Sequence, residues 1–269
     1  MSGVRAPLGD VYIVSDGMGG HQGGALAAEL TVETLGRNLL GVESGESARA
    51  EFELAFENAN RTVYERGHSG DTETQGMGAT AVVLLVAGSQ AMVAHVGDSR
   101  AYLFRQGELR RLTKDHSRVQ RMVDAGILTD AEAASHPASN LLERAIGVSP
   151  DVAADVSSWF ELDDGDQILL CSDGLHGYVS DGEIGAILNN RIAPQELAHQ
   201  LVDLALQKGG EDNITVQLVG YHHSGCGGCI PAMSRSTLIS TLLCISATTA
   251  FVANHAPLLA LGNVFRDHL

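Results

Sequence analysis

Four aspartates stand where carboxylates could gather around a metal ion: Asp16, Asp98, Asp173 and Asp212. Each is close to glycine and adjoins a short apolar run of the kind that forms a buried strand. A carboxylate at the tip of a strand is held in place, and glycine lets backbone groups approach it closely. Clustered carboxylates repel one another unless a cation neutralises them. Because every ligand would be an oxygen, the pattern favours Mg²⁺ or Mn²⁺ over zinc.

Each of these positions also has a purely structural interpretation, because glycine-flanked aspartate is common in ordinary turns. For Asp98, which lies between the apolar segments 91–96 and 101–105, a structural turn fits nearly as well as a metal site. His21 follows the glycine-rich residues 17–20, and an imidazole there could move a proton near neutral pH. A solvated loop histidine is the alternative.

The motifs resemble, in order, those of the metal-dependent serine/threonine protein phosphatases (the PPM family, type 2C, in its bacterial form). The segments that carry the resemblance are Asp16-Gly17-Met18-Gly19-Gly20-His21, Gly97-Asp98-Ser99-Arg100, Ser172-Asp173-Gly174 and Asp212-Asn213-Ile214-Thr215. The connecting pieces 76–80, 112–116 and 141–147 are also similar, and the segment 117–147 resembles the mobile flap that borders the site in this family. The ordered set is specific, although no single piece is.

The resemblance implies an α+β fold, a four-layer α-β-β-α sandwich of two antiparallel sheets flanked by helices. It also implies hydrolysis of phosphoserine and phosphothreonine in proteins by a water that two metal ions, Mn²⁺ or Mg²⁺, bridge and activate. Asp16 would bridge the two ions, and Asp98 with Asp173 would hold a third, weaker ion. His21 would protonate the leaving oxygen. The full set of implied metal ligands is Asp16, Gly17 through its carbonyl oxygen, Asp98, Asp173 and Asp212.

Two rival functions remain open: a pseudophosphatase or metal-binding scaffold with little turnover, and a hydrolase of small phosphomonoesters. A departure at the N-terminus favours the first. The family normally begins with a strand that carries an arginine, followed by an Asn-Glu-Asp-like motif, whereas only Met1 to Asp10 precede the first apolar run here. Arg5 and Asp10 lack the context of that motif, so neither is assigned, and weak binding of the second metal and of phosphate is expected.

The composition is that of a globular protein, with 44% hydrophobic residues and a formal net charge of −16. The excess of acid argues against a nucleic-acid partner and suits the capture of divalent cations. Residues 1–221 are long enough for one phosphatase domain, expected to be monomeric, and 222–235 read as a linker. In that linker Cys226 and Cys229 could hold a metal or act in redox chemistry, but flexible chain is the favoured interpretation. Cys171 lies in an apolar run and fits the core.

Hydrophobic periodicity and turn residues predict the elements that must position these side chains. Helices are predicted over residues 23–40, 47–66, 117–125, 181–189 and 194–208, with capping boxes at Thr129–Glu132 and Ser180–Glu183. Strands are predicted over 11–14, 79–87, 91–96, 101–105, 108–112, 152–160, 168–172 and 214–221. The short turns between neighbouring strands indicate antiparallel pairing.

The C-terminal segment predicts a membrane anchor. Residues 236–265 contain no Asp, Glu, Lys or Arg, and 238–261 is long enough to cross a bilayer as a helix. Arg235 before it fits a cytoplasmic N-terminal side, and no apolar signal segment opens the chain. A cytoplasmic catalytic domain anchored in the inner (plasma) membrane by one helix is therefore expected. A helix on the membrane surface and a segment packed on the domain are the alternatives.

Overall fold

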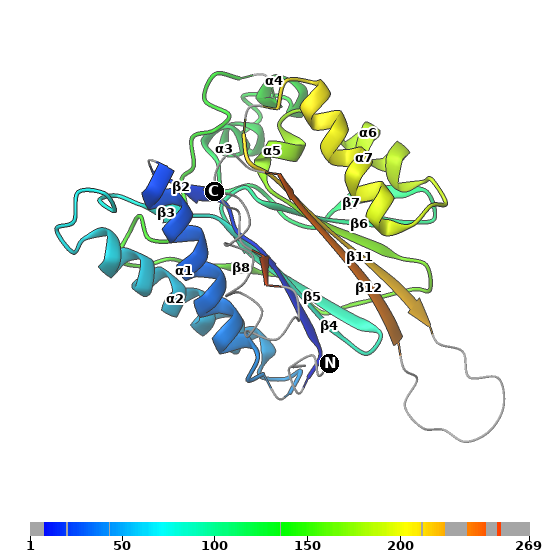
Figure 1. Cartoon of the computed structure of the whole chain (residues 1–269), viewed down its shortest axis with the longest axis horizontal. Coiled ribbons are helices and arrows are strands. Elements are labelled where there is room, and N and C mark those ends of the chain that lie inside the picture. Colours follow the sequence, from blue (N-terminus) through cyan, green and yellow to red (C-terminus); the bar gives the residue numbers. More distant parts are fainter. Residues whose placement is uncertain are drawn as a thin grey trace, which may run out of the picture.

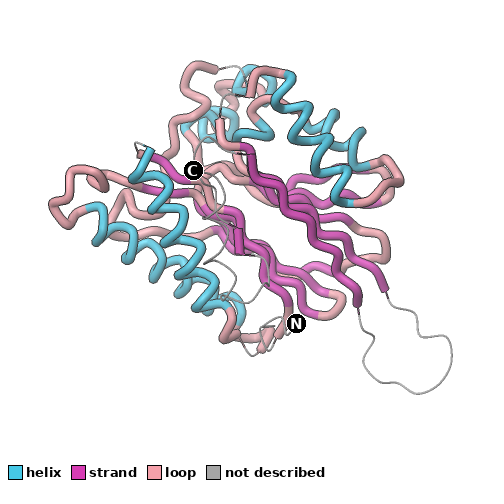
Figure 2. The backbone as a smooth tube through the Cα atoms, viewed as in Figure 1, coloured by secondary structure: helices cyan, strands magenta, loops and turns pink. Residues whose placement is uncertain are grey.

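Two antiparallel sheets lie face to face, with helices on their outer sides (Figures 1 and 2). The computed structural model describes residues 8–19, 21–42, 44–134, 136–210, 212–223, 236–245 and 252–253. The first sheet has the strand order β13-β1-β4-β5-β8, with β9 also paired to β5. Its strands are β1 (Asp10–Val14), β4 (Ala81–Ala87), β5 (Gln90–Val96), β8 (Asp155–Val156), β9 (Phe160–Glu161) and β13 (Val252–Ala253).

The second sheet has the strand order β12-β11-β10-β6-β7. Its strands are β6 (Arg100–Arg105), β7 (Glu108–Arg111), β10 (Gln167–Cys171), β11 (Ile214–His223) and β12 (Ser236–Ile245). A short pair, β2 (Gly17–Met18) and β3 (Gly78–Ala79), stands apart from both sheets. The strand predicted over 152–160 is replaced by the two short strands β8 and β9, which pair with different parts of β5.

The helices fall into two groups, one for each sheet. The helices α1 (His21–Leu39) and α2 (Ala48–Gly67) cover the first sheet, and α5 (Asp173–His176), α6 (Asp181–Leu188) and α7 (Pro194–Gln207) cover the second (Figure 1). Two short helices, α3 (Arg118–Asp124) and α4 (Asp130–Ala134), lie between β7 and β8 in the chain. Both predicted capping boxes are confirmed, since Glu132 and Glu183 accept hydrogen bonds from the backbone N–H groups of Thr129 and Ser180 at 2.8 and 3.0 Å.

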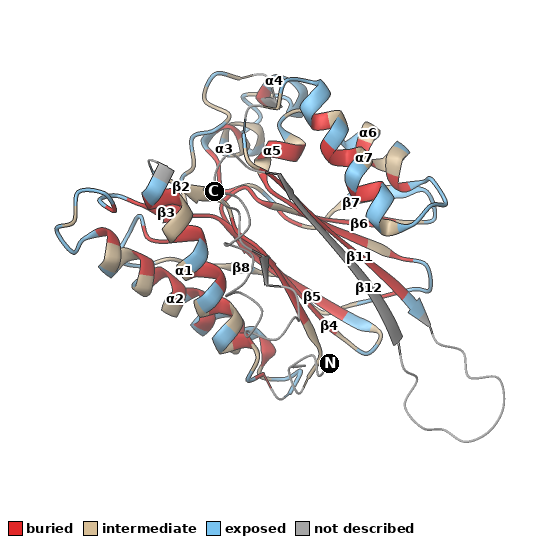
Figure 3. Cartoon of the chain, viewed as in Figure 1, coloured by how far each residue is buried: buried red, intermediate tan, exposed pale blue. Residues whose placement is uncertain are grey.

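Side chains alternate along each strand and so form three apolar layers. On β1, Val11 packs among residues of α1 and α2, whereas Tyr12 packs among residues of the second sheet. On β10, Leu169 packs toward α5 to α7 and Leu170 toward the first sheet. Figure 3 shows the strands buried between exposed outer helix surfaces. Because both faces of each sheet are packed, the loops at the strand ends are carried on a rigid frame.

The predicted transmembrane helix is wrong, and with it the predicted membrane anchor and anchored location. Residues 236–245 form the strand β12, which pairs with β11 along its whole length, from Ile245 opposite Ile214 to Ser236 opposite His223. Among the described residues, no helix is both long and apolar enough to span a bilayer. A hydropathy criterion measures the length of a segment and its lack of charge. It contains no information about the edge of β11, whose backbone N–H and C=O groups pair with an adjacent strand.

Candidate active site

A cavity of about 600 Å³ lies where the carboxylate-bearing loops meet. Because β10 and β11 are antiparallel neighbours, the end of β10 meets the start of β11, and the loop after β1 reaches the same place. All five residues expected to serve as metal ligands line this cavity: Asp16, Gly17, Asp98, Asp173 and Asp212. The structure therefore brings the predicted ligand set together, while the role of each residue as a ligand stays a prediction.

A chain of buried hydroxyl groups holds the turn that carries Asp16. Ser15 Oγ donates a hydrogen bond to the carbonyl of Thr80 at 2.6 Å, and Thr80 Oγ1 accepts one from the N–H of Asp16 at 3.2 Å. Thr80 Oγ1 also lies 2.6 Å from Ser99 Oγ. Because Ser99 follows Asp98, the hydroxyl chain ties the two carboxylate loops to one another.

A close contact between β10 and β11 places Asp173 beside Asp212. Ser172 Oγ donates a hydrogen bond to the carbonyl of Asn213 at 3.0 Å. A Cβ atom on Gly174 would lie 2.3 Å from the same carbonyl oxygen, so only glycine permits the approach. The glycine after Asp173 is thus needed to bring the two strand ends together.

The Asp98 loop is fixed from three sides. Gly97 has φ +97°, and a Cβ atom there would lie 2.6 Å from Thr80 Cγ2. The N–H of Gly97 donates a hydrogen bond to His116 Nδ1 at 3.1 Å. His176 Nε2 lies 3.0 Å from the carbonyl of Asp98, and burial lowers the pKa of His176 to about 3, so its neutral ring donates this bond.

The site concentrates buried negative charge. Burial, reinforced by the charge of Asp173, raises the pKa of Asp98 to about 8 and that of Asp16 well above its usual value. Burial also raises the pKa of Asp173. Within the described part of the chain, the buried Oδ1 atom of Asp173 has no hydrogen-bond partner. A buried carboxylate oxygen without a partner is costly unless a cation neutralises it, so this cluster of carboxylates fits a hard divalent ion.

The structure does not test the role of His21. It is the first residue of α1, and its side chain lies outside the described part of the structure. Arg5, Cys226 and Cys229 also lie outside the described residues. Asp10 begins β1 and is not among the described residues that line the cavity.

The cavity wall includes residues that the sequence did not single out. Residues 140–145, from the segment that resembles the family flap, line the cavity, as do 148–149 and 151–153. Arg144 is the one basic side chain among the described residues that line it. The segment 141–147 carries part of the family resemblance, but nothing in its spacing indicates that its arginine lines the same cavity as the distant aspartates.

The fold and the site together define a metal-dependent phosphatase, and comparisons with known proteins agree. The sequence profile of the family "Protein phosphatase 2C" matches residues 3–219. The protein phosphatase PhpP of Streptococcus pneumoniae is 38% identical over 211 residues, which is 78% of this chain and 85% of PhpP. The structure of the Streptococcus agalactiae serine/threonine phosphatase matches with a TM-score of 0.73 and 37% identity, covering 79% of this chain and 87% of that one.

A further solved structure bears on the metal. The catalytic domain of the serine/threonine protein phosphatase PstP, in complex with two manganese ions, matches with a TM-score of 0.69 and 36% identity, covering 78% of this chain and 86% of that one. The chain belongs to the protein phosphatase 2C family. It is a metal-dependent serine/threonine protein phosphatase, and its cofactor is Mn²⁺ or Mg²⁺.

Proposed function

We propose that the cavity aspartates are the residues that carry this hydrolysis. Asp16, Asp173 and Asp212, with the carbonyl oxygen of Gly17, would hold two ions, and Asp98 with Asp173 would hold a third, weaker one. The observation that carries the proposal is the buried, unpartnered Oδ1 of Asp173 in a cavity that the other three carboxylates line. When bound, the ions supply an activated water for in-line attack on phosphorus and offset charge on the phosphoryl oxygens.

His21 is proposed as the general acid of the reaction. It stands directly after the glycine-rich loop that begins at Asp16, on the first turn of α1. Protonation of the leaving serine or threonine oxygen by a positioned imidazole contributes on the order of 10²–10⁴ in rate. The alternative, a solvated histidine without a catalytic role, predicts no such contribution.

The substrates are phosphoproteins, since the relatives are serine/threonine protein phosphatases. We further infer that the catalytic residues all lie within 1–221, that the protein acts as a monomer, and that nucleic acid is not a partner. The net charge of −16 supports the last point, because an acidic surface repels a polyanion. Activity on small aryl phosphates alone would instead indicate a small-molecule phosphomonoesterase.

The test is phosphate release by the purified full chain from a phosphothreonine peptide. We expect activity with Mn²⁺ or Mg²⁺, none in EDTA, and recovery when the ion is restored. Asp173→Asn should lose most of the activity while staying folded. Asp203→Asn, an exposed carboxylate on α7, is the matched control and should behave like the wild type. Full activity in EDTA would contradict the mechanism, and a folded, metal-binding protein without turnover would indicate a pseudophosphatase.

A further inference from the structure

Arg144 is a positive charge in a cavity whose other charged lining residues are all acidic within the described chain. A phosphate ester that enters this cavity approaches carboxylates from several elements. Each carboxylate that no cation neutralises repels it. A guanidinium presents planar pairs of N–H groups that match two phosphoryl oxygens, so an arginine at this wall is chemically suited to the substrate's anionic group.

One end of the Arg144 guanidinium is already anchored. Its Nη1 donates hydrogen bonds to Asp155 Oδ1 at 2.6 Å and to the carbonyl of Ala153 at 2.9 Å. Ala153 itself lines the cavity, so the guanidinium lies at the cavity wall. Both bonds use Nη1, and Nη2 and Nε make no hydrogen bond to the described residues. The Arg144 side chain is 37% exposed, so part of it can be reached by a ligand.

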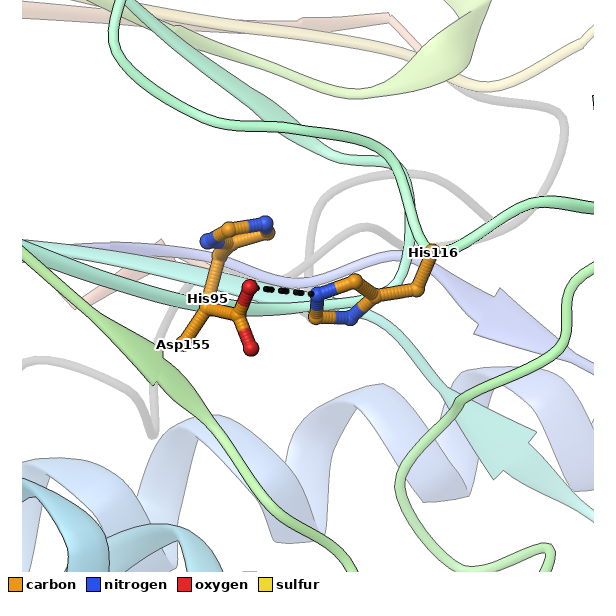
Figure 4. A group of neighbouring side chains, drawn as sticks. All are labelled: His95, His116 and Asp155. Carbon is orange, nitrogen blue, oxygen red and sulfur yellow. Dashed lines mark ion pairs between the residues drawn. The ribbon is translucent and has the colours of Figure 1, made fainter. Parts of the chain in front are cut away.

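Two histidines lie beside this pair, and together with Asp155 they are close enough to suggest a metal site. Ligand atoms of His95, His116 and Asp155 all lie within 4.8 Å of one another (Figure 4). However, His116 Nδ1 already accepts the N–H of Gly97, so the neutral ring carries its proton on Nε2. Nε2 therefore faces Asp155, 3.4 Å away, as a donor rather than as a metal ligand.

The guanidinium of Arg144 already contacts two of these three residues. Its Nη1 is 3.2 Å from His116 Nε2 and is hydrogen-bonded to Asp155. The ring of His95 stacks on that of His116, with centroids 4.6 Å apart, and its Nε2 lies 2.7 Å from the carbonyl of Lys114. A second cation would be repelled, so the cluster is a support that holds Asp155 and, through it, Arg144.

We propose that Arg144 binds the phosphoryl group of the substrate, with Nη1 held by Asp155 and with Nε and Nη2 donating to two phosphoryl oxygens. Asp155 is a positioning residue. It fixes the orientation of the Arg144 guanidinium before the substrate arrives and so reduces the conformational entropy lost on binding. The inference rests on the proposed function of the cavity, because it requires that the phosphate bind beside the aspartates.

The experiment compares Arg144→Ala and Arg144→Lys with the wild-type full chain at saturating Mn²⁺. The measurements are KM and kcat for a phosphothreonine peptide, the inhibition constant of inorganic phosphate, and the Mn²⁺ concentration for half-maximal activity. For Arg144→Ala we expect KM and the phosphate inhibition constant to rise together by about tenfold or more, because a hydrogen-bonded charge is lost. The Mn²⁺ requirement should stay within about twofold. Arg144→Lys keeps the positive charge but not the pair of parallel N–H donors. It should therefore recover only part of the lost phosphate affinity.

Two further variants separate binding from structure. Arg121→Ala removes a guanidinium from the same flap-like segment, where it pairs with Glu143 at 2.9 Å without lining the cavity, and should leave both constants unchanged. Asp155→Asn should raise the phosphate inhibition constant less than Arg144→Ala does. Adding it to Arg144→Ala should cause little further loss, because the two residues act as one unit.

Three results would overturn the proposal: an unchanged phosphate inhibition constant in Arg144→Ala, a loss explained by weaker Mn²⁺ binding, or an equal loss in Arg121→Ala. If Arg144→Ala does not fold, Arg144→Lys provides the same comparison, since it keeps a cation beside Asp155. If the wild type shows no Mn²⁺-dependent turnover, the proposed function fails. Calorimetric binding of inorganic phosphate to the Mn²⁺-loaded wild type and variants then still decides the role of Arg144.

Discussion

Asp16 and Thr80, which are 64 positions apart in the chain, exchange two hydrogen bonds. The N–H of Thr80 donates to the carbonyl of Asp16 at 2.8 Å, and Thr80 Oγ1 accepts from the N–H of Asp16 at 3.2 Å. The loop with the central carboxylate is therefore fixed by the start of β4, not only by its own strand. Thr80 also reaches Ser99, next to Asp98, so one hydroxyl sets the spacing of two carboxylate loops.

Thr80→Val should separate this positioning role from packing. The change keeps the shape of the side chain but leaves the N–H of Asp16 and the hydroxyl of Ser99 without their partner. We expect the free energy of unfolding to fall by about 1–3 kcal/mol and Mn²⁺-dependent activity to fall with it. Urea denaturation and phosphate release measure the two effects. Thr80→Ser keeps the hydroxyl and serves as the control, and a Val variant as stable and active as that control would contradict the role.

Metal should stabilise the folded protein, and Asp173 should be required for this effect. An ion that binds only the native state adds about 2.7 kcal/mol at a concentration one hundred times its dissociation constant. We expect Mn²⁺ to raise the melting temperature of the wild type and to have little effect on Asp173→Asn. In EDTA the variant should be at least as stable as the wild type, because it removes a buried carboxylate with an unpartnered oxygen. Differential scanning fluorimetry distinguishes these outcomes, and an equal Mn²⁺ shift in both proteins would exclude Asp173 as a ligand.

The role of His21 can be tested through the leaving group. If its imidazole protonates the leaving oxygen, His21→Ala should lower kcat on a phosphothreonine peptide by on the order of 10²-fold or more. An aryl phosphate has a better leaving group, needs less protonation, and should lose less. Steady-state rates on both substrates at the same Mn²⁺ concentration give the comparison. Equal losses on the two substrates would remove His21 from this role.

The buried His116 should make the stability of the protein depend on pH. Burial, aided by His95 and Arg144, lowers the pKa of His116 to about 4 in the folded state, whereas an unfolded histidine has a pKa near 6.5. The unfolded state therefore binds more protons in this interval, so stability is lost as the pH falls from about 6.5 toward 4. We expect a loss on the order of 1–2 kcal/mol after allowance for partial solvent screening.

Denaturation in urea between pH 4.5 and 7.5 measures this dependence. The variant His116→Asn removes the titrating ring but retains, near the position of Nδ1, a side-chain oxygen that can accept the N–H of Gly97. The free energy of unfolding of the variant should change less over the same interval. The comparison needs the whole pH range, because at pH 7.5 the wild-type ring is neutral and the two proteins do not differ in this titration. Identical slopes in the wild type and the variant would show that His116 is not the responsible group.

The pairing of β12 with β11 predicts a consequence of truncation. Ending the chain at His223 would remove β12 and expose the backbone edge of Ile214–His223. We expect a lower midpoint of urea denaturation and self-association that increases with concentration, because exposed edges pair with other strands. Sedimentation velocity of the truncated and full chains at several concentrations is the measurement. A truncated protein that stays monomeric and equally stable would show that β12 contributes nothing to the fold.

Local properties of the sequence were enough to predict the strand ends that carry the aspartates. An apolar run followed by Asp-Gly identifies a strand end at Asp16 and at Asp173, because side-chain alternation and glycine conformations depend on near neighbours. The capping boxes that begin α4 and α6 are equally local and were predicted correctly. The gathering of four aspartates was a hypothesis from their chemistry, since no single segment specifies what lies beside it.

Only the tertiary structure decided which distant groups meet. The partner of Asp16 at Thr80, the anchoring of Arg144 by Asp155, and the place of Arg144 in the cavity wall depend on the packing of both sheets. The segment 236–245 is the clearest case. Its apolar, uncharged sequence suits a membrane helix, yet it forms a strand because β11 offers an edge of backbone donors and acceptors. Hydropathy measures transfer of a segment from water, whereas strand pairing depends on a partner that only the folded chain supplies.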